Sequence, residues 1–241
     1  MTDMPLESHG GGQVAGLRGL VADWSGDQQT FQVAWGKAMM WIFLLSDTFI
    51  FGSFLTGYMT VRTSTIVPWP NPSEVFALDI GGKPVPLLLI AIMTFILISS
   101  SGTMAMAVNC AYRGDKATAA KLMFATAAFG ATFVSMQAFE WTKLIMDEGV
   151  RPWGNPMGAA QFGSVFFMVT GFHGLHVTAG VIYLCVVALR LLAGKYDAAT
   201  PKSGSGPAPS GGNYQIVEIA GLYWHFVDLV WVFIFALFYL W

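Results

Sequence analysis

Three of the chain's four histidines and one aspartate lie inside two apolar runs of the sequence. The first run is Gly171-Phe-His-Gly-Leu-His176 and the second is Tyr223-Trp-His-Phe-Val-Asp228. Imidazole and carboxylate groups can ligate metals, transfer protons or hydrogen-bond neighbouring helices. An ionisable side chain inside a bilayer is costly, so it faces protein or water and usually serves a purpose. These residues therefore carry most of what the sequence predicts about function.

The spacing of these residues suits helices. His173 and His176 stand three residues apart, and His225 and Asp228 repeat that spacing, so each pair shares a helix face. Histidine and carboxylate on facing helices can build a metal site in a bundle. The Glu-x-x-His pairs of di-iron sites are absent, however, and the two cysteines are not arranged as ligands. We expect structural hydrogen bonds between helices and no metal, with a metal or haem site as the alternative.

Small residues and a further carboxyl group accompany the histidines. Gly171, Gly174 and Gly180 would let a neighbouring helix approach closely. Glu218 lies seven residues before His225, on nearly the same face of the same predicted helix. We expect Glu218 to be another structural polar residue of the membrane interior.

Four more polar residues lie in or at the ends of apolar runs. Asp47 stands ten residues after Lys37, about 15 Å along a helix, and could act in proton chemistry or lock two helices together. Gln137 and Glu140 share a helix face, and a hydrogen bond to a neighbouring helix is their expected role. Arg190 ends the fourth apolar run, where a guanidinium can grip a lipid phosphate. Charge placement alone favours a plain positive-inside anchor for Arg190.

The composition is that of an integral membrane protein. Hydrophobic residues make up 55% of the 241 residues and charged residues only 11%, whereas soluble domains carry about 25% charge. The net charge of -2 argues against nucleic acid as a partner. The surface of the chain is therefore expected to face mostly lipid or protein.

Five apolar segments are long enough to cross a bilayer as helices, which takes about 20 residues. None alternates in polarity as a barrel strand would. The sequence thus predicts an all-α, polytopic bundle of five transmembrane helices, at about Ala34–Val61, Val85–Ala111, Thr118–Ile145, Ala160–Leu192 and Gln215–Trp241.

The remaining segments set the domain organisation. Residues 1–33 are polar and Gly-rich, which indicates a flexible tail without a signal peptide, and residues 34–241 form one transmembrane domain. The long, Pro-rich first connection should be irregular and ordered only by packing. The fourth connection, residues 195–213, is rich in Ser, Gly and Pro and should be flexible.

Positive charges predict the orientation of the spans. With the N-terminus in the cytoplasm, eight Lys and Arg residues lie inside and four outside, which favours a cytoplasmic N-terminus and an external C-terminus. The inside set is Arg18, Lys37, Arg113, Lys116, Lys121, Arg190, Lys195 and Lys202, and the outside set is Arg62, Lys83, Lys143 and Arg151.

Four stretches of the sequence resemble subunit III of the haem-copper respiratory oxidases (cytochrome c oxidase subunit 3). They are Gly163-Ser-Val-Phe-Phe-Met-Val-Thr-Gly-Phe-His-Gly-Leu-His-Val177, Tyr223-Trp-His-Phe-Val-Asp-Leu-Val-Trp231, Gln137-Ala-Phe-Glu-Trp141 and Ser46-Asp47. The resemblance covers roughly residues 35–241. It is to the five-helix bacterial form, which lacks two N-terminal helices that other members carry.

The resemblance implies a non-catalytic subunit of a proton-pumping, oxygen-reducing complex in the bacterial inner membrane. Haem and copper would be held by partner subunits, with subunit I in direct contact and subunit II in the same complex. The family's roles are stabilising subunit I, sustaining proton uptake and holding phospholipid. By residue, Asp47 takes the place of a buried reactive glutamate and Arg190 that of a lipid-binding arginine. Glu140, His173, His176, His225 and Asp228 match positions that we expect to be structural.

Alternatives remain open at this point. The electron donor could be cytochrome c, which is more common, or quinol. An accessory protein of nitric oxide reductase would belong to the same family. From other classes, an independent proton-coupled transporter would need a water-lined path through broken helices, and a membrane cytochrome would bind haem through its own histidines.

Overall fold

A computed structural model describes residues 35–80, 83–196 and 215–241 of the chain. Its five long helices are each apolar enough to cross a membrane, which confirms the predicted all-α fold with five spans. Each predicted boundary lies within three residues of the observed one. The helices are α2 (Trp35–Ser64), α4 (Leu88–Tyr112), α5 (Lys116–Met146), α6 (Gln161–Leu192) and α7 (Gln215–Phe235), which continues into a π-helical turn, η1 (Ala236–Leu240).

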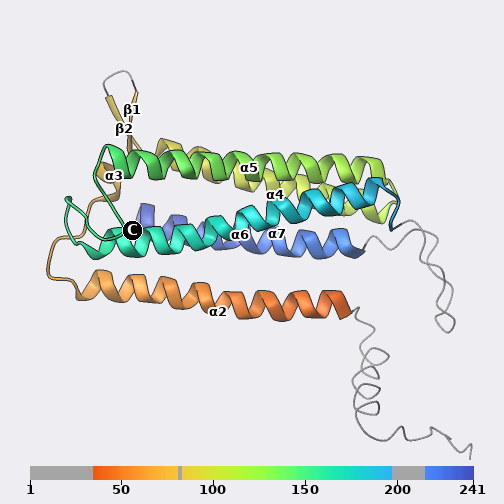
Figure 1. Cartoon of the computed structure of the whole chain (residues 1–241), viewed down its shortest axis with the longest axis horizontal. Helices are drawn as coiled ribbons and strands as arrows, with labels where there is room; N and C mark the ends of the chain where they lie inside the picture. The colour runs from red at the N-terminus through yellow and green to blue at the C-terminus, as the bar shows by residue number, and fades with distance from the viewer. Residues whose placement is uncertain (1–34, 81–82, 197–214) are drawn as a thin grey trace, which may run out of the picture.

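Four of the helices form a closed ring. Helix α4 packs against α5 and α7, and α6 packs against the same two helices from the other side. Consecutive helices run in opposite directions, since α4 is joined to α5 by only a three-residue turn. Helix α2 lies outside the ring and packs against α6 and α7 (Figure 1). It is the least buried of the five spans, and α7 is the most buried.

The two ends of the bundle differ. The start of α2, the α4–α5 turn, the end of α6 and the start of α7 share one end, which we call the α4–α5 end (Figure 1). At that turn Gly114 adopts φ +78°, a conformation that favours glycine. Asp115 caps α5 by accepting a hydrogen bond from the Thr118 amide at 3.1 Å. Hydrogen bonding to Thr118 holds the pKa of the Asp115 carboxyl below its usual range.

The first connection is more regular than predicted. It holds a short helix, α3 (Pro72–Val75), and an antiparallel hairpin of β1 (Ala77–Ile80) and β2 (Lys83–Pro86). Prolines fit this hairpin because Pro84 and Pro86, two residues apart, lack their N–H groups on the same outer edge. The expectation of an irregular loop was therefore wrong, because a two-stranded hairpin has no central strand that proline would break.

Aromatic packing holds the first connection to the bundle. The Phe76 ring lies 4.5 Å from that of Tyr239 and 5.3 Å from that of Phe166, between ring centroids. The Trp69 ring makes edge contacts with Tyr58 and Phe162 at 5.7 and 5.6 Å. Packing therefore orders this segment, as predicted, in addition to its own backbone hydrogen bonds.

Trp224 of α7 fills the middle of the ring. Its indole N–H donates to Ser100 Oγ of α4 at 2.9 Å. Its ring faces Gly130 of α5 and Gly180 of α6, and a Cβ added at Gly180 would lie 3.0 Å from it. A single side chain thus contacts all three other helices of the ring, and glycine is required where it meets α5 and α6.

The predicted close approach at the glycines of α6 holds for two of the three. Gly171 faces the Trp141 ring and Gly180 faces Trp224, whereas nothing lies within 4 Å of a Cβ added at Gly174. The N-terminal segment 1–33 and residues 197–214 of the fourth connection lie outside the described residues.

Candidate functional site: paired polar groups within the membrane

Asp47 and His176 meet between α2 and α6, near the middle of both helices. Oδ2 of Asp47 lies 3.0 Å from Nε2 of His176, although the two groups are not aligned as a hydrogen bond. The other ring nitrogen, Nδ1, lies 2.9 Å from the main-chain oxygen of Phe172. Asp47 is only 4% exposed. The contact joins α2 to the ring through two ionisable groups.

The chemistry of this pair follows from its acceptors. A main-chain oxygen can only accept, so Nδ1 of His176 must carry a hydrogen. In the neutral ring Nε2 would then present a lone pair to the Asp47 carboxylate, which also only accepts. One further proton, on either His176 or Asp47, removes that repulsion. The pair is therefore suited to hold one proton in common inside the membrane.

His173 behaves as an aromatic packing residue. Its ring stacks on Trp231 with centroids 5.5 Å apart and meets Phe133 edge-on at 5.9 Å. It is 1% exposed, and neither ring nitrogen has a hydrogen-bond partner among the residues that the structure describes. The expected hydrogen bond between helices is thus absent at His173, because the neighbours at this depth are aromatic rings without lone-pair acceptors.

Gln137, Glu140 and Tyr239 form a buried hydrogen-bonded cluster between α5 and η1. Gln137 Nε2 donates to Glu140 Oε2 at 2.8 Å. The Tyr239 hydroxyl donates to Glu140 Oε1 at 3.1 Å. The π-helical turn places this hydroxyl, and Tyr239 is itself 2% exposed. The Glu140 carboxyl thus bonds a different helix, as its placement in the sequence suggested, whereas Gln137 bonds a residue of its own helix.

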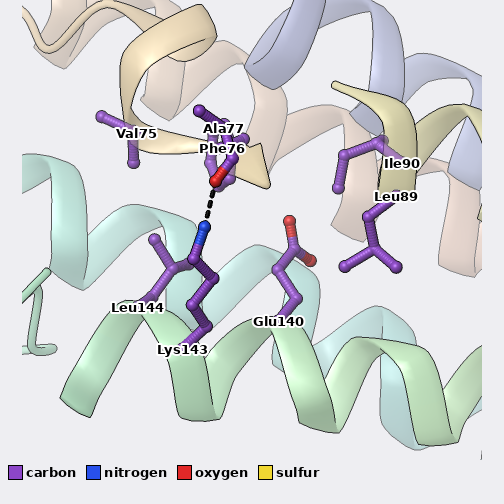
Figure 2. A pocket seen from close by; sticks show the side chains of 8 residues that line it. All are labelled: Val75, Phe76, Ala77, Leu89, Ile90, Glu140, Lys143 and Leu144. Atoms are coloured by element: carbon purple, nitrogen blue, oxygen red, sulfur yellow. Dashed lines mark hydrogen bonds between the residues drawn. The ribbon is translucent and has the colours of Figure 1, made fainter. Parts of the chain in front are cut away.

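Glu140 also lines a small pocket beneath the first connection. Figure 2 shows its carboxyl group pointing into the pocket, with Leu89 and Ile90 of α4 to one side. On the other side Lys143, one turn later on α5, donates to the main-chain oxygen of Ala77 in β1. Lys143 therefore ties the hairpin to α5, and the pocket is bounded by both.

Glu218 lies at the α4–α5 end of the bundle and pairs with two other helices. Lys37 Nζ of α2 and the Tyr112 hydroxyl of α4 each donate to its carboxylate at 2.5 Å. The sequence placed Glu218 near the face of His225, but the structure does not bring these two residues together. Glu218 instead joins α2, α4 and α7 at their ends.

His225 and Asp228 lie along the contact between α7 and α4. Nδ1 of His225 lies 2.7 Å from Ser101 Oγ of α4. Asp228 is half-buried and also interacts with Ser101, but its solvent-shielded Oδ1 atom has no hydrogen-bond partner within the described ranges. The predicted contact between helices is present for His225, while Asp228 retains an unused acceptor.

Arg190 lies in the last turn of α6, at the α4–α5 end. Its side chain is exposed, and it makes no hydrogen bond or ion pair with the described residues. The guanidinium is thus available to a ligand outside the bundle. The structure also places no three His, Cys, Asp or Glu side chains of the described ranges close enough to hold a metal ion.

The fold and these contacts define a multi-pass membrane bundle in which several ionisable groups join one helix to another. The family profile described as "Cytochrome c oxidase subunit III" matches residues 20–241. The chain therefore belongs to the cytochrome c oxidase subunit III family, and so to the subunits of respiratory oxidase complexes.

Similar proteins agree with this family. A probable cytochrome c oxidase subunit 3 of Nocardia farcinica is 31% identical, over 82% of this chain and 84% of its own length. The cytochrome c oxidase subunit 3 of Synechocystis is 33% identical, over 83% of this chain and 72% of its own. The cytochrome bo(3) ubiquinol oxidase subunit 3 of Pseudomonas putida is 30% identical, over 83% of each.

The sequence did not predict three residues that take part in polar contacts between helices: Tyr239, Ser101, and Lys37 as the partner of Glu218. Lys37 and Glu218 both lie in the first turn of helices that run the same way, so equal depth was a usable signal. Ser101 and Tyr239 carried no such signal, because an uncharged polar residue in a span is common and its partner depends on how the helices are arranged.

Proposed function

We propose that this chain is a non-redox subunit of a proton-pumping haem-copper terminal oxidase in a bacterial inner membrane. It contacts subunit I directly, and subunit II belongs to the same complex. The observation that carries this proposal is the pairing of the chain's own ionisable groups across helices, as in Asp47–His176 and Tyr239–Glu140. Groups committed to one another are not free to ligate haem or copper, which we assign to the partner subunits.

The orientation we propose has the α4–α5 end in the cytoplasm. The described cations Lys37, Arg113, Lys116, Lys121, Arg190 and Lys195 gather at or near that end. Cytoplasmic loops are enriched in Lys and Arg. The N-terminus of α2 then faces the cytoplasm and the hairpin faces outward.

Asp47 and His176 have a proton-related role in this proposal. The pair is suited to hold one proton in common. It lies in the middle of the membrane between α6 and α2, and α2 is the least buried of the spans. We infer that it sustains proton delivery to the neighbouring catalytic subunit. The same contact joins α2 to the ring, so it also stabilises the subunit.

Arg190 is the proposed phospholipid site. An exposed guanidinium at the predicted cytoplasmic end of a span lies at the depth of lipid head groups. It can bind a phosphate through two parallel hydrogen bonds, and no described residue competes for it. Lipid held there would support the working lifetime of the complex.

Cytochrome c is the proposed electron donor of the complex. Quinol is the second candidate, which the similarity to a ubiquinol oxidase subunit 3 supports. Donor sites would lie on other subunits. Oxygen consumption by the purified complex with reduced cytochrome c or with a quinol separates the two.

Purification through a tag on this chain tests the proposal. We expect one complex that contains a larger haem-bearing subunit and reduces oxygen. Recovery of the chain by itself from gently solubilised membranes, with full activity in a transport assay, would contradict the proposal.

A further inference from the structure

A patch of polar side chains lies on the outward side of α7 at mid-membrane depth. Asp228 is 13 residues from the first residue of the Gln215–Leu240 span and 12 from its last. Ser101 is 13 residues from the start of α4 and 11 from its end. His225 joins the two helices through its 2.7 Å contact with Ser101. The patch formed by Ser101, His225 and Asp228 therefore lies close to the bilayer centre.

This patch differs from the other polar groups at the same depth. Asp47 and His173 are buried, and His176 is largely covered, with 14% of its side chain exposed. His225 is exposed on the surface of the bundle. Ionisable side chains within membranes almost always face protein or a water-filled cavity. Lipid tails offer no hydrogen-bonding group, so the outer ring nitrogen of a lipid-facing His225 would be left without a partner.

His225 gives the chemistry of the missing neighbour. Its Nδ1 atom meets Ser101, and its Nε2 atom has no partner among the described residues. Asp228 also interacts with Ser101, and its Oδ1 atom is covered by this chain itself. An imidazole nitrogen can bond a polar side chain as donor or acceptor. Lipid phosphates lie too far from the bilayer centre to take part.

The surroundings of the patch suit a helix. Leu229, Val232 and Phe233 continue the same face of α7 beyond Asp228, and they are 55%, 42% and 53% exposed. An apolar face with polar groups at its centre is typical of helix contacts in membranes, where polar side chains bond across the interface.

We propose that the seam of α4 and α7 marked by Ser101, His225 and Asp228 is the docking site for a transmembrane helix of another oxidase subunit. That helix presents a polar side chain to Nε2 of His225 at the bilayer centre. The proposal rests on the proposed function, since it requires a partner subunit, and it adds where the partner docks and what chemistry it offers.

Photo-crosslinking in the intact complex tests the site. A photoreactive p-benzoyl-phenylalanine replaces Leu229, and a control probe replaces Leu175 of α6, another mid-span leucine, which is 64% exposed. We expect the Leu229 probe to join this chain to one other subunit, and the Leu175 probe to give far less of that product. Attachment of the Leu229 probe to lipid, attachment within this chain, or equal yields from both probes would overturn the proposal.

Substitution of the imidazole supplies a second measurement. His225→Leu removes the hydrogen-bonding group, whereas His225→Gln keeps one in a similar place. Polar contacts between membrane helices are modest, so we expect His225→Leu to weaken retention of the partner about three- to tenfold and His225→Gln much less. Equal retention in both variants, at equal amounts of this chain in the membrane, would contradict the proposal.

The two proposals fail in different ways. If this chain is recovered without any haem-bearing subunit, the proposed function is wrong. If it is recovered with that subunit but the Leu229 probe labels only lipid, the proposed function stands and the docking site is wrong.

Discussion

At the scale of single residues, three polar contacts join helices that are distant in the chain. Asp47 meets His176, Tyr239 donates to Glu140, and Lys37 pairs with Glu218. Each contact lies within or at the end of the membrane-spanning region, where an unpaired polar group is costly. The partners therefore matter as much as the residues that stand out in the sequence.

Asp47→Asn tests the proton role of its contact. The amide cannot share a proton with His176, so we expect slower proton uptake by the complex. The haem spectrum should stay unchanged, because we assign no ligand role to Asp47. The exposed neighbour Ser46, whose hydroxyl bonds only its own helix, supplies the control Ser46→Ala. A lost haem signal in an assembled Asp47→Asn complex would refute this assignment.

Tyr239→Phe tests the buried cluster of Glu140. The change removes a hydrogen-bond donor from a carboxyl group that is 4% exposed. Leaving a buried acceptor without its donor costs about 1–3 kcal/mol, so thermal unfolding should begin at a lower temperature. Tyr183→Phe is the matched control, because its hydroxyl makes no hydrogen bond with the described residues. Equal midpoints for both variants would speak against the cluster as a stabilising contact.

Arg190→Ala tests the lipid site. Loss of a bound phospholipid should shorten the working lifetime of the oxidase more than it lowers the initial rate. Bound phosphorus per complex, measured after delipidation, should fall. Lys195→Ala removes a nearby exposed cation and should change neither quantity. An immediate loss of rate at normal assembly would argue against lipid binding at Arg190.

The sequence showed which residues lie in the membrane but few of their partners. The depth of Asp47 and of His176 could be counted along their helices, yet the contact depends on which faces of α2 and α6 meet. His173 illustrates the same limit. Its place in an apolar run was clear, but its aromatic neighbours Phe51, Phe133 and Trp231 come from three other helices.

At the scale of elements, the ring of α4, α5, α6 and α7 is built around Trp224. The indole reaches α4 through Ser100 and lies against glycines of α5 and α6. Hydrophobic patterning predicted the spans because each is simply long and apolar. It could not predict the packing of Trp224 against these glycines, since glycine in a membrane helix often has no close neighbour, as Gly174 shows.

Gly130→Ala tests the close contact between the Trp224 ring and α5. A Cβ at this position would overlap the Trp224 ring and would lie 2.7 Å from Val181. Overpacking of this kind costs about 1–3 kcal/mol, so we expect lower thermal stability of the subunit. Gly174→Ala adds the same methyl group where nothing lies within 4 Å. Equal thermal stability of the Gly130→Ala and Gly174→Ala variants would show that α5 and α7 move apart without cost, and so would contradict tight packing at Gly130.

The hairpin of β1 and β2 could not be predicted from the amino-acid composition of the first connection. Five prolines between the first two spans suggested an irregular segment. Spacing mattered more than number, because alternate prolines leave the inner edge of a strand able to pair. The aromatic contacts next to the hairpin join Phe76 to Phe166 and Tyr239, which lie far along the chain from it.

At the scale of the whole molecule, the chain combines a closed ring with one loosely covered helix. The ring buries Gln137, Glu140 and His173, while α2 and the outward side of α7 remain exposed. Long helices of 25–32 residues exceed the thickness of the hydrocarbon core and will tilt or project. This architecture suits a subunit that packs beside a catalytic partner.

Selective removal of this subunit from the purified oxidase tests whether haem and copper belong to its partner subunits. Iron, copper and the optical spectrum are measured in the depleted complex and in the released chain. We expect all haem and copper to stay with the depleted complex and the released chain to hold neither. Iron or copper leaving in stoichiometric amounts with this chain, ligated by its own histidines, would contradict this expectation.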